Sequence, residues 1–158
     1  MDPSWVEAFF FTAMQQGYAG GTGPKTKVLD MPGYKEIRYA DGDFLLVDRW
    51  CVNPDSEKSA GTTTIWYQEK PVWLMGYGGV YPKVVIPFLK QALRFQYCKD
   101  GHFLGGRGPK LVTDRVAGQI YMNRPVQNDF DRFNGREEIV DMSTGAVGYH
   151  DYWGMSLL

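Results

Sequence analysis

The chain has 158 residues, of which 44% are hydrophobic and 22% are charged, and its formal net charge at pH 7 is −1. This length suits a single domain over residues 1–158, and the composition is that of a globular chain, which excludes intrinsic disorder. The 17 basic and 18 acidic residues are mixed along the chain, so no basic cluster is present for direct nucleic-acid binding.

In the N-terminal region we expect neither a membrane-spanning segment nor a signal peptide. Its longest apolar run, residues 8–11, is far shorter than the roughly 20 residues that a spanning helix needs, and Asp2 and Glu7 stand where a signal peptide is basic. Cys51 and Cys98 are too few for a disulfide scaffold. We therefore expect a cytoplasmic, reduced protein with no membrane partner.

The chain is predicted to begin with a helix over residues 3–16. Apolar side chains follow at helical spacing, Asp2 or Ser4 can cap the helix, and Pro3 suits its first turn. Gly17 is placed to end it.

Two β-hairpins are predicted after this helix. Asp41-Gly42 is a strong signal for a two-residue hairpin turn. In chain order, the predicted elements are a strand over 34–39, the Asp41-Gly42 turn, strands over 43–48 and 62–67, a turn at 69–71 and a strand over 72–77.

The sequence of the second part of the chain predicts the same order, a helix followed by strands. A helix over 84–97 has Pro87 within its first turn, where proline is tolerated. The predicted strands that follow are 111–122, 137–142 and 147–153, with a turn at 143–145.

An internal repeat is indicated by the motif GGxGPK, which occurs at residues 20–25 and again at 105–110. Self-similarity at a fixed spacing is typical of repeated units. Further matches relate Asp43-Phe44 to Asp129-Phe130, the segment at Gly61 to that at Gly135, and the segment at Tyr77 to that at Tyr152. We therefore predict pseudo-repeats over approximately 3–79 and 84–154.

The predicted fold class is α+β. Strands joined by tight turns pair antiparallel, and two helices can cover only one face of a sheet of this size. We expect a curved antiparallel sheet with two helices on one face, built from two similar helix–loop–hairpin–hairpin halves. The uncovered face then forms a cavity, meets a partner or stays polar.

No recognised catalytic or metal-binding pattern is present, so we assign no catalytic residue, metal or cofactor. The first glycine-rich loop follows a helix and precedes a strand, which is the reverse of a phosphate-binding P-loop. Its Lys25, and Lys110 of the second loop, remain candidates for weak anion binding. His102 and His150 are the only histidines and lack zinc-ligand spacing.

The carboxylates are more informative. Asp43 and Asp48 are predicted to point to opposite faces of one strand, as are the adjacent Glu137 and Glu138, so one of each pair points inward. An inward carboxylate on an aromatic face could receive a cationic or sugar-like ligand or act in acid–base chemistry. The alternative is an edge-strand charge that prevents aggregation.

Several segments resemble an uncharacterised bacterial and archaeal domain family. These segments are YAGG at 18–21, YADGDF at 39–44, WYQEKPVWLM at 66–75, FNGREEI at 133–139 and YWG at 152–154. The resemblance covers most of the chain and implies a domain of unknown function, which in some members follows a helix-turn-helix segment as in transcription regulators. These 158 residues contain no such segment, and the resemblance assigns no catalytic residue.

Three functions are therefore considered. The first is a non-enzymatic small-molecule-binding or sensor-like domain with an aromatic-lined pocket. The second is a protein-interaction module or homodimer that acts through an exposed sheet face, and the third is a hydrolase that uses an inward carboxylate with His150. The candidate ligand-binding residues are Tyr39, Asp43, Asp48, Trp66, Trp73, Tyr77, Glu137, Tyr149, His150 and Tyr152.

Overall fold

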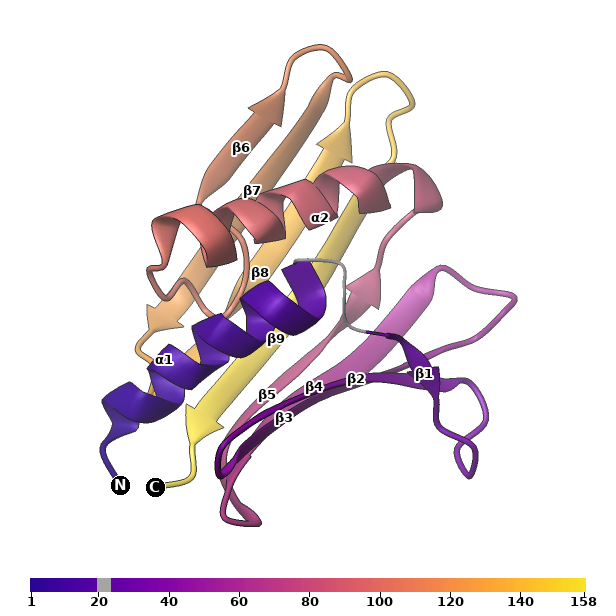
Figure 1. Cartoon of the computed structure of the whole chain (residues 1–158). Coiled ribbons are helices and arrows are strands. Elements are labelled where there is room, and N and C mark those ends of the chain that lie inside the picture. Colours follow the sequence, from indigo (N-terminus) through magenta and orange to yellow (C-terminus); the bar gives the residue numbers. More distant parts are fainter. Residues whose placement is uncertain (20–23) are drawn as a thin grey trace.

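The computed structural model describes residues 1–19 and 24–158 of the chain. Its described strands form one antiparallel sheet in the order β1-β2-β3-β4-β5-β9-β8-β7-β6, and two α-helices lie on one face of this sheet (Figure 1). Figure 1 also shows that the sheet curves around the helices. The predicted α+β class, with a curved antiparallel sheet and two helices on one face, is confirmed.

Each half of the chain runs from a helix into its strands. The first half consists of α1 (Pro3–Ala13), a π-helical segment (Met14–Ala19), β1 (Thr26–Lys27), β2 (Tyr34–Asp41), β3 (Phe44–Val52), β4 (Lys58–Tyr67) and β5 (Lys70–Val80). The second half consists of a 3₁₀ turn (Lys83–Val85), α2 (Ile86–Phe95), a π-helical segment (Gln96–Asp100), β6 (Leu111–Asp114), β7 (Gln119–Asn128), β8 (Arg132–Asp141) and β9 (Val147–Ser156).

The first helix starts as predicted but ends differently. The Asp2 carboxylate caps it by accepting a hydrogen bond from the Ser4 N–H at 2.9 Å. Gly17 does not end the helical backbone, which continues through it as the π-helical segment. A Cβ at Gly17 would lie 3.3 Å from the Ile37 side chain, so this glycine permits close packing on β2.

Two predicted turns are shifted by one residue. Asp41 pairs with Phe44, so the first hairpin loop is Gly42-Asp43, with Gly42 at φ +56°. The second loop is Gln68-Glu69, where both residues have positive φ.

The predicted single strand over 111–122 is wrong, because a hairpin lies within it. The Asp114 carboxylate turns the chain by accepting hydrogen bonds from the Val116 and Ala117 N–H groups, each at 2.9 Å. This turn separates β6 from β7 and contains Gly118 at φ +67°. The side-chain turn has no Asn-Gly or Asp-Gly signature, which is why the sequence pattern did not reveal it.

The second glycine-rich loop packs against the inner face of the sheet, the face covered by the helices. Gly105 and Gly106 have positive φ, a backbone conformation that glycine adopts without steric cost. The Tyr97 hydroxyl donates to the Gly106 carbonyl at 2.7 Å, and the Gly108 N–H donates to the Tyr121 hydroxyl at 2.9 Å. Residues 20–23 of the first glycine-rich loop lie outside the described residues.

Both halves contain the same crossing of a tyrosine over a glycine. Tyr77 of β5 reaches across β4 at Gly61 to donate to Asp48 of β3 at 2.8 Å. Tyr152 of β9 reaches across β8 at Gly135 to donate to Asn123 of β7 at 2.7 Å.

Each crossing requires a glycine, because a Cβ at Gly61 or Gly135 would collide with the tyrosine hydroxyl. Asp43 and Asp129, by contrast, do not occupy equivalent turns in the two halves. Asp43 lies between β2 and β3, and Asp129 lies between β7 and β8. That the two halves derive from one repeated unit remains a prediction.

The core fills the space between the helices and the inner face. Phe10 of α1, Trp73 of β5 and Tyr97 after α2 are completely or almost completely buried there. No helix within residues 1–19 and 24–158 has both the length and the apolar character needed to cross a membrane.

Candidate functional site

A pocket of about 420 Å³ lies over the first half of the sheet, between the inner faces of β3, β4 and β5 and the start of α2. Its inner walls include Asp48, Tyr81, Leu89 and His150, each less than 10% exposed. Its size falls within the range of roughly 300–1,000 Å³ that is typical of ligand sites.

Asp48 is the buried carboxylate of this pocket, with 4% of its surface exposed. Its Oδ1 atom accepts hydrogen bonds from the Thr63 and Tyr77 hydroxyls, each at 2.8 Å. Its Oδ2 atom accepts none from the described residues. Burial raises the pKa of Asp48, although the two hydroxyl donors and the charge of Arg107 act against this shift. A ligand donor would therefore find an acceptor here.

Lysines surround the mouth of the pocket. Five line it, together with two carboxylates, those of Asp48 and Glu57. Lys25 lies with its Nζ 5.6 Å from the centroid of the Trp50 ring, and burial lowers the pKa of this lysine, as do Lys90 and Lys35. The mouth therefore carries a positive field. The lysines are Lys25, Lys35, Lys58, Lys83 and Lys90.

His150 of β9 closes the inner end of the pocket. Its Nε2 lies 3.2 Å from the Ser59 hydroxyl of β4. This contact passes over Gly79 of β5, which pairs with both residues and has no side chain to block it. Burial lowers the pKa of His150 to about 4, and the charge of Arg107 contributes to the same shift. The imidazole is therefore neutral near pH 7.

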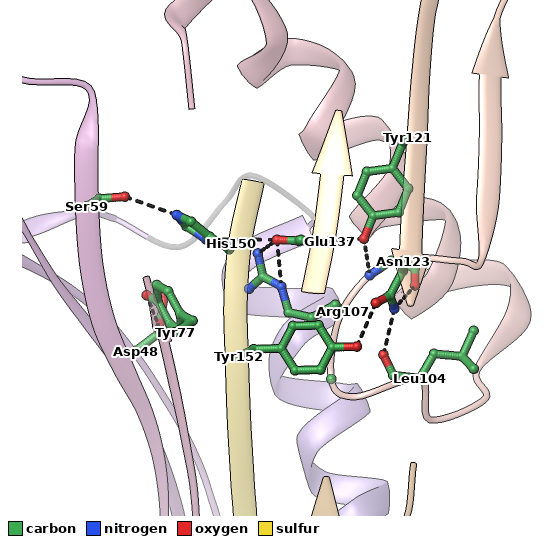
Figure 2. A network of polar contacts seen from close by, with 12 residues as sticks. Asp48, Ser59, Tyr77, Leu104, Arg107, Tyr121, Asn123, Glu137, His150 and Tyr152 are labelled. Atoms are coloured by element: carbon green, nitrogen blue, oxygen red, sulfur yellow. Dashed lines mark hydrogen bonds and ion pairs between the residues drawn. The ribbon is translucent and has the colours of Figure 1, made fainter. Parts of the chain in front are cut away.

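Behind His150 lies a buried ion pair (Figure 2). Arg107 of the second glycine-rich loop donates to Glu137 Oε1 through Nη2 and, at 2.9 Å, through Nε. The Tyr121 hydroxyl donates to Glu137 Oε2 at 2.6 Å. Burial would raise the pKa of Glu137, but the charge and hydrogen bonds of Arg107 hold it below its usual range.

Arg107 also connects this ion pair to the pocket. Its Cζ lies 5.4 Å from the centroid of the Tyr77 ring, whose hydroxyl binds Asp48. The polar groups of the two halves are therefore in contact through one buried cation.

The arrangement of Ser59, His150 and Glu137 lacks a feature of nucleophilic catalysis. In such sites the base is oriented by a hydrogen bond from a third group. Here His150 Nδ1 lies 3.9 Å from Glu137 Oε1, and this buried nitrogen has no hydrogen-bond partner among the described residues. Glu137 instead binds Arg107 and Tyr121.

Three of the predicted site residues meet in the pocket: Asp48, Tyr77 and His150. Glu137 and Glu138 point to opposite faces as predicted: Glu137 is the inward one and lies behind His150, while Glu138 lies on the other face and forms an ion pair with Arg124.

The other candidates lie elsewhere. Trp73 and Tyr152 are buried in the core, where the Trp73 indole N–H donates to the Phe130 carbonyl at 3.1 Å. Tyr39 packs on Phe9, with 5.9 Å between ring centroids.

Asp43 was predicted to belong to a strand but lies in the exposed β2–β3 turn, where it accepts from Gln68. Trp66 and Tyr149 lie on the outer face of the sheet, because they alternate with the inward-facing Ile65 and His150.

Sequence reasoning missed several residues that build this region. Trp50 and Tyr81 line the pocket, and Arg107 neutralises Glu137. The alternation along β3 could have identified Trp50, since it is two residues from Asp48. Nothing in the local sequence around Arg107 indicates that its side chain is buried. Lys25 does line the pocket, whereas its counterpart Lys110 is exposed and does not.

Replacing Glu137 by Gln should strongly destabilise the protein, because Arg107 would become a buried cation without a counter-charge. We expect a loss of about 3–5 kcal/mol in the free energy of unfolding, measured with urea. The control Glu138→Gln breaks the partly exposed pair with Arg124 and should cost less than about 1 kcal/mol. Equal effects of the two variants would contradict a special role for the buried pair.

His150 should make stability depend on pH. Its pKa of about 4 lies below the ordinary 6.5, so the unfolded chain binds the proton more tightly and stability falls as the pH drops from 6.5 towards 4. Between pH 6.5 and 4.5 the wild type should lose about 2–3 kcal/mol more than His150→Asn. The raised pKa of Asp48 acts in the opposite direction in both proteins.

Urea unfolding at the two pH values measures this difference. The control His102→Asn removes an exposed histidine and should keep the wild-type pH dependence. A His150→Asn variant with that same dependence would show that His150 is not held neutral by burial.

Comparison with known proteins identifies a family but no function. No curated protein and no solved structure matches the chain. A family profile described as "Domain of unknown function (DUF5680)" matches residues 55–155. This match contains Ser59, Tyr77, Glu137 and His150, whereas Asp48 precedes it. The resemblance to an uncharacterised domain family is confirmed, and the chain belongs to the DUF5680 family of domains of unknown function.

Proposed function

We propose that this protein is a small-molecule-binding, sensor-like domain whose ligand occupies the pocket over β3, β4 and β5. The observation that carries this proposal is the buried carboxylate of Asp48, whose Oδ2 atom lies in a cavity without a donor from the described residues. Oδ2 is not among the fully buried atoms that lack a partner, so it is accessible from the cavity, and an accessible acceptor on a cavity wall indicates a place for a ligand group or water.

The surroundings of Asp48 support this function. Tyr77 and Tyr81 give the pocket aromatic walls, and Ile86 and Leu89 of the second helical region add an apolar side. Apolar walls with a few placed polar groups are typical of small-molecule sites. Asp48 and Tyr77 are also held in place by hydrogen bonds, so the site is formed before a ligand arrives.

A thermal-shift screen of metabolites on the purified protein tests this proposal. A ligand that binds the folded state at a hundred times its Kd should stabilise it by about 2.7 kcal/mol, or roughly 5 °C or more in Tm for a chain of this size. Asp48→Asn should reduce the shift, because it replaces the open acceptor by an amide N–H₂ group. Asp43→Asn in the exposed turn is the matched control. If no class of compound stabilises the protein, the proposal is contradicted.

Self-association through the outer face of the sheet is a second candidate function. Trp153 is 54% exposed in β9, a central strand, although tryptophan is usually largely buried. Met155 is the next residue along the same face, at 44% exposure, whereas the ion-paired Asp151 separates both from Val147. An apolar patch in the middle of a sheet is typical of an interface, here with a second copy of the chain.

Analytical ultracentrifugation over a range of concentrations tests this second candidate. The wild type should sediment as a dimer at high concentration, and Trp153→Gln should weaken the association by tenfold or more, as expected for an aromatic residue at the centre of an interface. Trp5→Gln changes a tryptophan of similar exposure on α1 and should have no effect. A wild type that stays monomeric would refute the homodimer.

A further inference from the structure

We infer that the pocket binds an organic anion with an apolar, preferably aromatic, body and an N–H or O–H donor at its inner end. This inference rests on the proposed small-molecule function and specifies the ligand class. Three features of the pocket carry it: an open acceptor inside, a positive mouth and aromatic walls between them.

The open acceptor inside the pocket becomes clear when the two tyrosine crossings are compared. In the second half, Tyr152 donates to Asn123 Oδ1, and Asn123 Nδ2 donates to the Leu104 and Gly108 carbonyls at 2.9 and 2.7 Å. The Nδ2 atom of Asn123 is therefore satisfied by the second glycine-rich loop and by Leu104, which precedes this loop (Figure 2).

In the first half, Tyr77 donates in the same way to Asp48 Oδ1, but no described residue donates to Oδ2. The pocket lies where a partner for this oxygen should be, and 4% exposure leaves Asp48 little access to bulk water. Because a carboxylate oxygen accepts hydrogen bonds, the ligand group that meets it is a donor.

The mouth determines the charge of the ligand. Five lysines and only two carboxylates line the pocket, and one of the carboxylates is the buried Asp48. The other, Glu57, already accepts a hydrogen bond from the backbone N–H of Lys83 at 3.1 Å. This excess of ammonium groups attracts an anion and repels a cation. A carboxylate or phosphate at the outer end of the ligand fits this mouth.

The walls determine the body of the ligand. Trp50, Tyr77 and Tyr81 present aromatic rings, and Ile86 and Leu89 lie on the helical side. A flat apolar body buries its surface against such walls. It also joins the donor that meets Asp48 to the anionic group that meets the lysines, which a small inorganic anion does not.

Three related probes separate these features in isothermal titration calorimetry. Indole-3-acetate has the anion, the aromatic body and an N–H donor. Naphthalene-1-acetate lacks the donor, and tryptamine replaces the anion by a cation. Indole-3-acetate should bind about tenfold more tightly than naphthalene-1-acetate, the usual effect of one hydrogen bond to a charged group, and at least tenfold more tightly than tryptamine.

Two pairs of variants locate the effects. Asp48→Asn keeps an oxygen for Thr63 and Tyr77 but turns an amide N–H₂ group towards the pocket, so the advantage of indole-3-acetate over naphthalene-1-acetate should disappear. Asp43→Asn should preserve it. Lys25→Met should weaken both anions several-fold, while Lys110→Met, at the matching position of the other GGxGPK motif, should leave them unchanged.

The outcomes distinguish this inference from the function on which it rests. Binding of tryptamine as tightly as indole-3-acetate, or equal binding of both anions to the wild type, would overturn the inferred ligand class but not the pocket. If metabolites stabilise the protein in the thermal-shift screen but neither anion binds, the inferred ligand class is likewise overturned while the pocket stands. Failure of the screen and of all three probes would refute both.

Discussion

The buried pair of Arg107 and Glu137 is the interaction on which the polar interior depends. Two charges without access to water are tolerated only when each is paired and hydrogen-bonded, and Glu137 meets this condition through Arg107 and Tyr121. The pair fixes the second glycine-rich loop on the sheet and places a cation beside His150 and Tyr77. It therefore joins the loop, β8, β9 and β5 at the centre of the sheet.

This pair also makes the two halves differ. Over β7 and β8 the glycine-rich loop occupies the inner face, and its backbone satisfies Tyr121 and Asn123. Over β3 and β4 the space is a pocket, where Asp48 has one oxygen without a described donor. The same tyrosine crossing thus leads to a filled, structural arrangement in one half and, among the described residues, to an open one in the other. We attribute ligand binding to the open half for this reason.

Glycines determine which side chains can meet across the strands. Gly61 allows Tyr77 of β5 to reach β3, and Gly79 lies between Ser59 of β4 and His150 of β9, where a Cβ would collide with the Tyr149 backbone. In an antiparallel sheet such pairs are separated by a whole strand, and any side chain at the intervening position would block them. The composition of the pocket is therefore a result of register as much as of the residues that line it.

The sequence by itself determined the α+β class, most strands, the capped first helix and the opposite orientations of Glu137 and Glu138, because local periodicity and turn chemistry specify these features. It also placed Asp48, Tyr77 and His150 among the candidates. Only the tertiary structure showed that Trp66 and Tyr149 face outward, that Asp43 lies in a turn and that Arg107 is buried beside Glu137. These facts depend on strand register and on contacts between residues far apart in the chain, which spacing along a single strand does not encode.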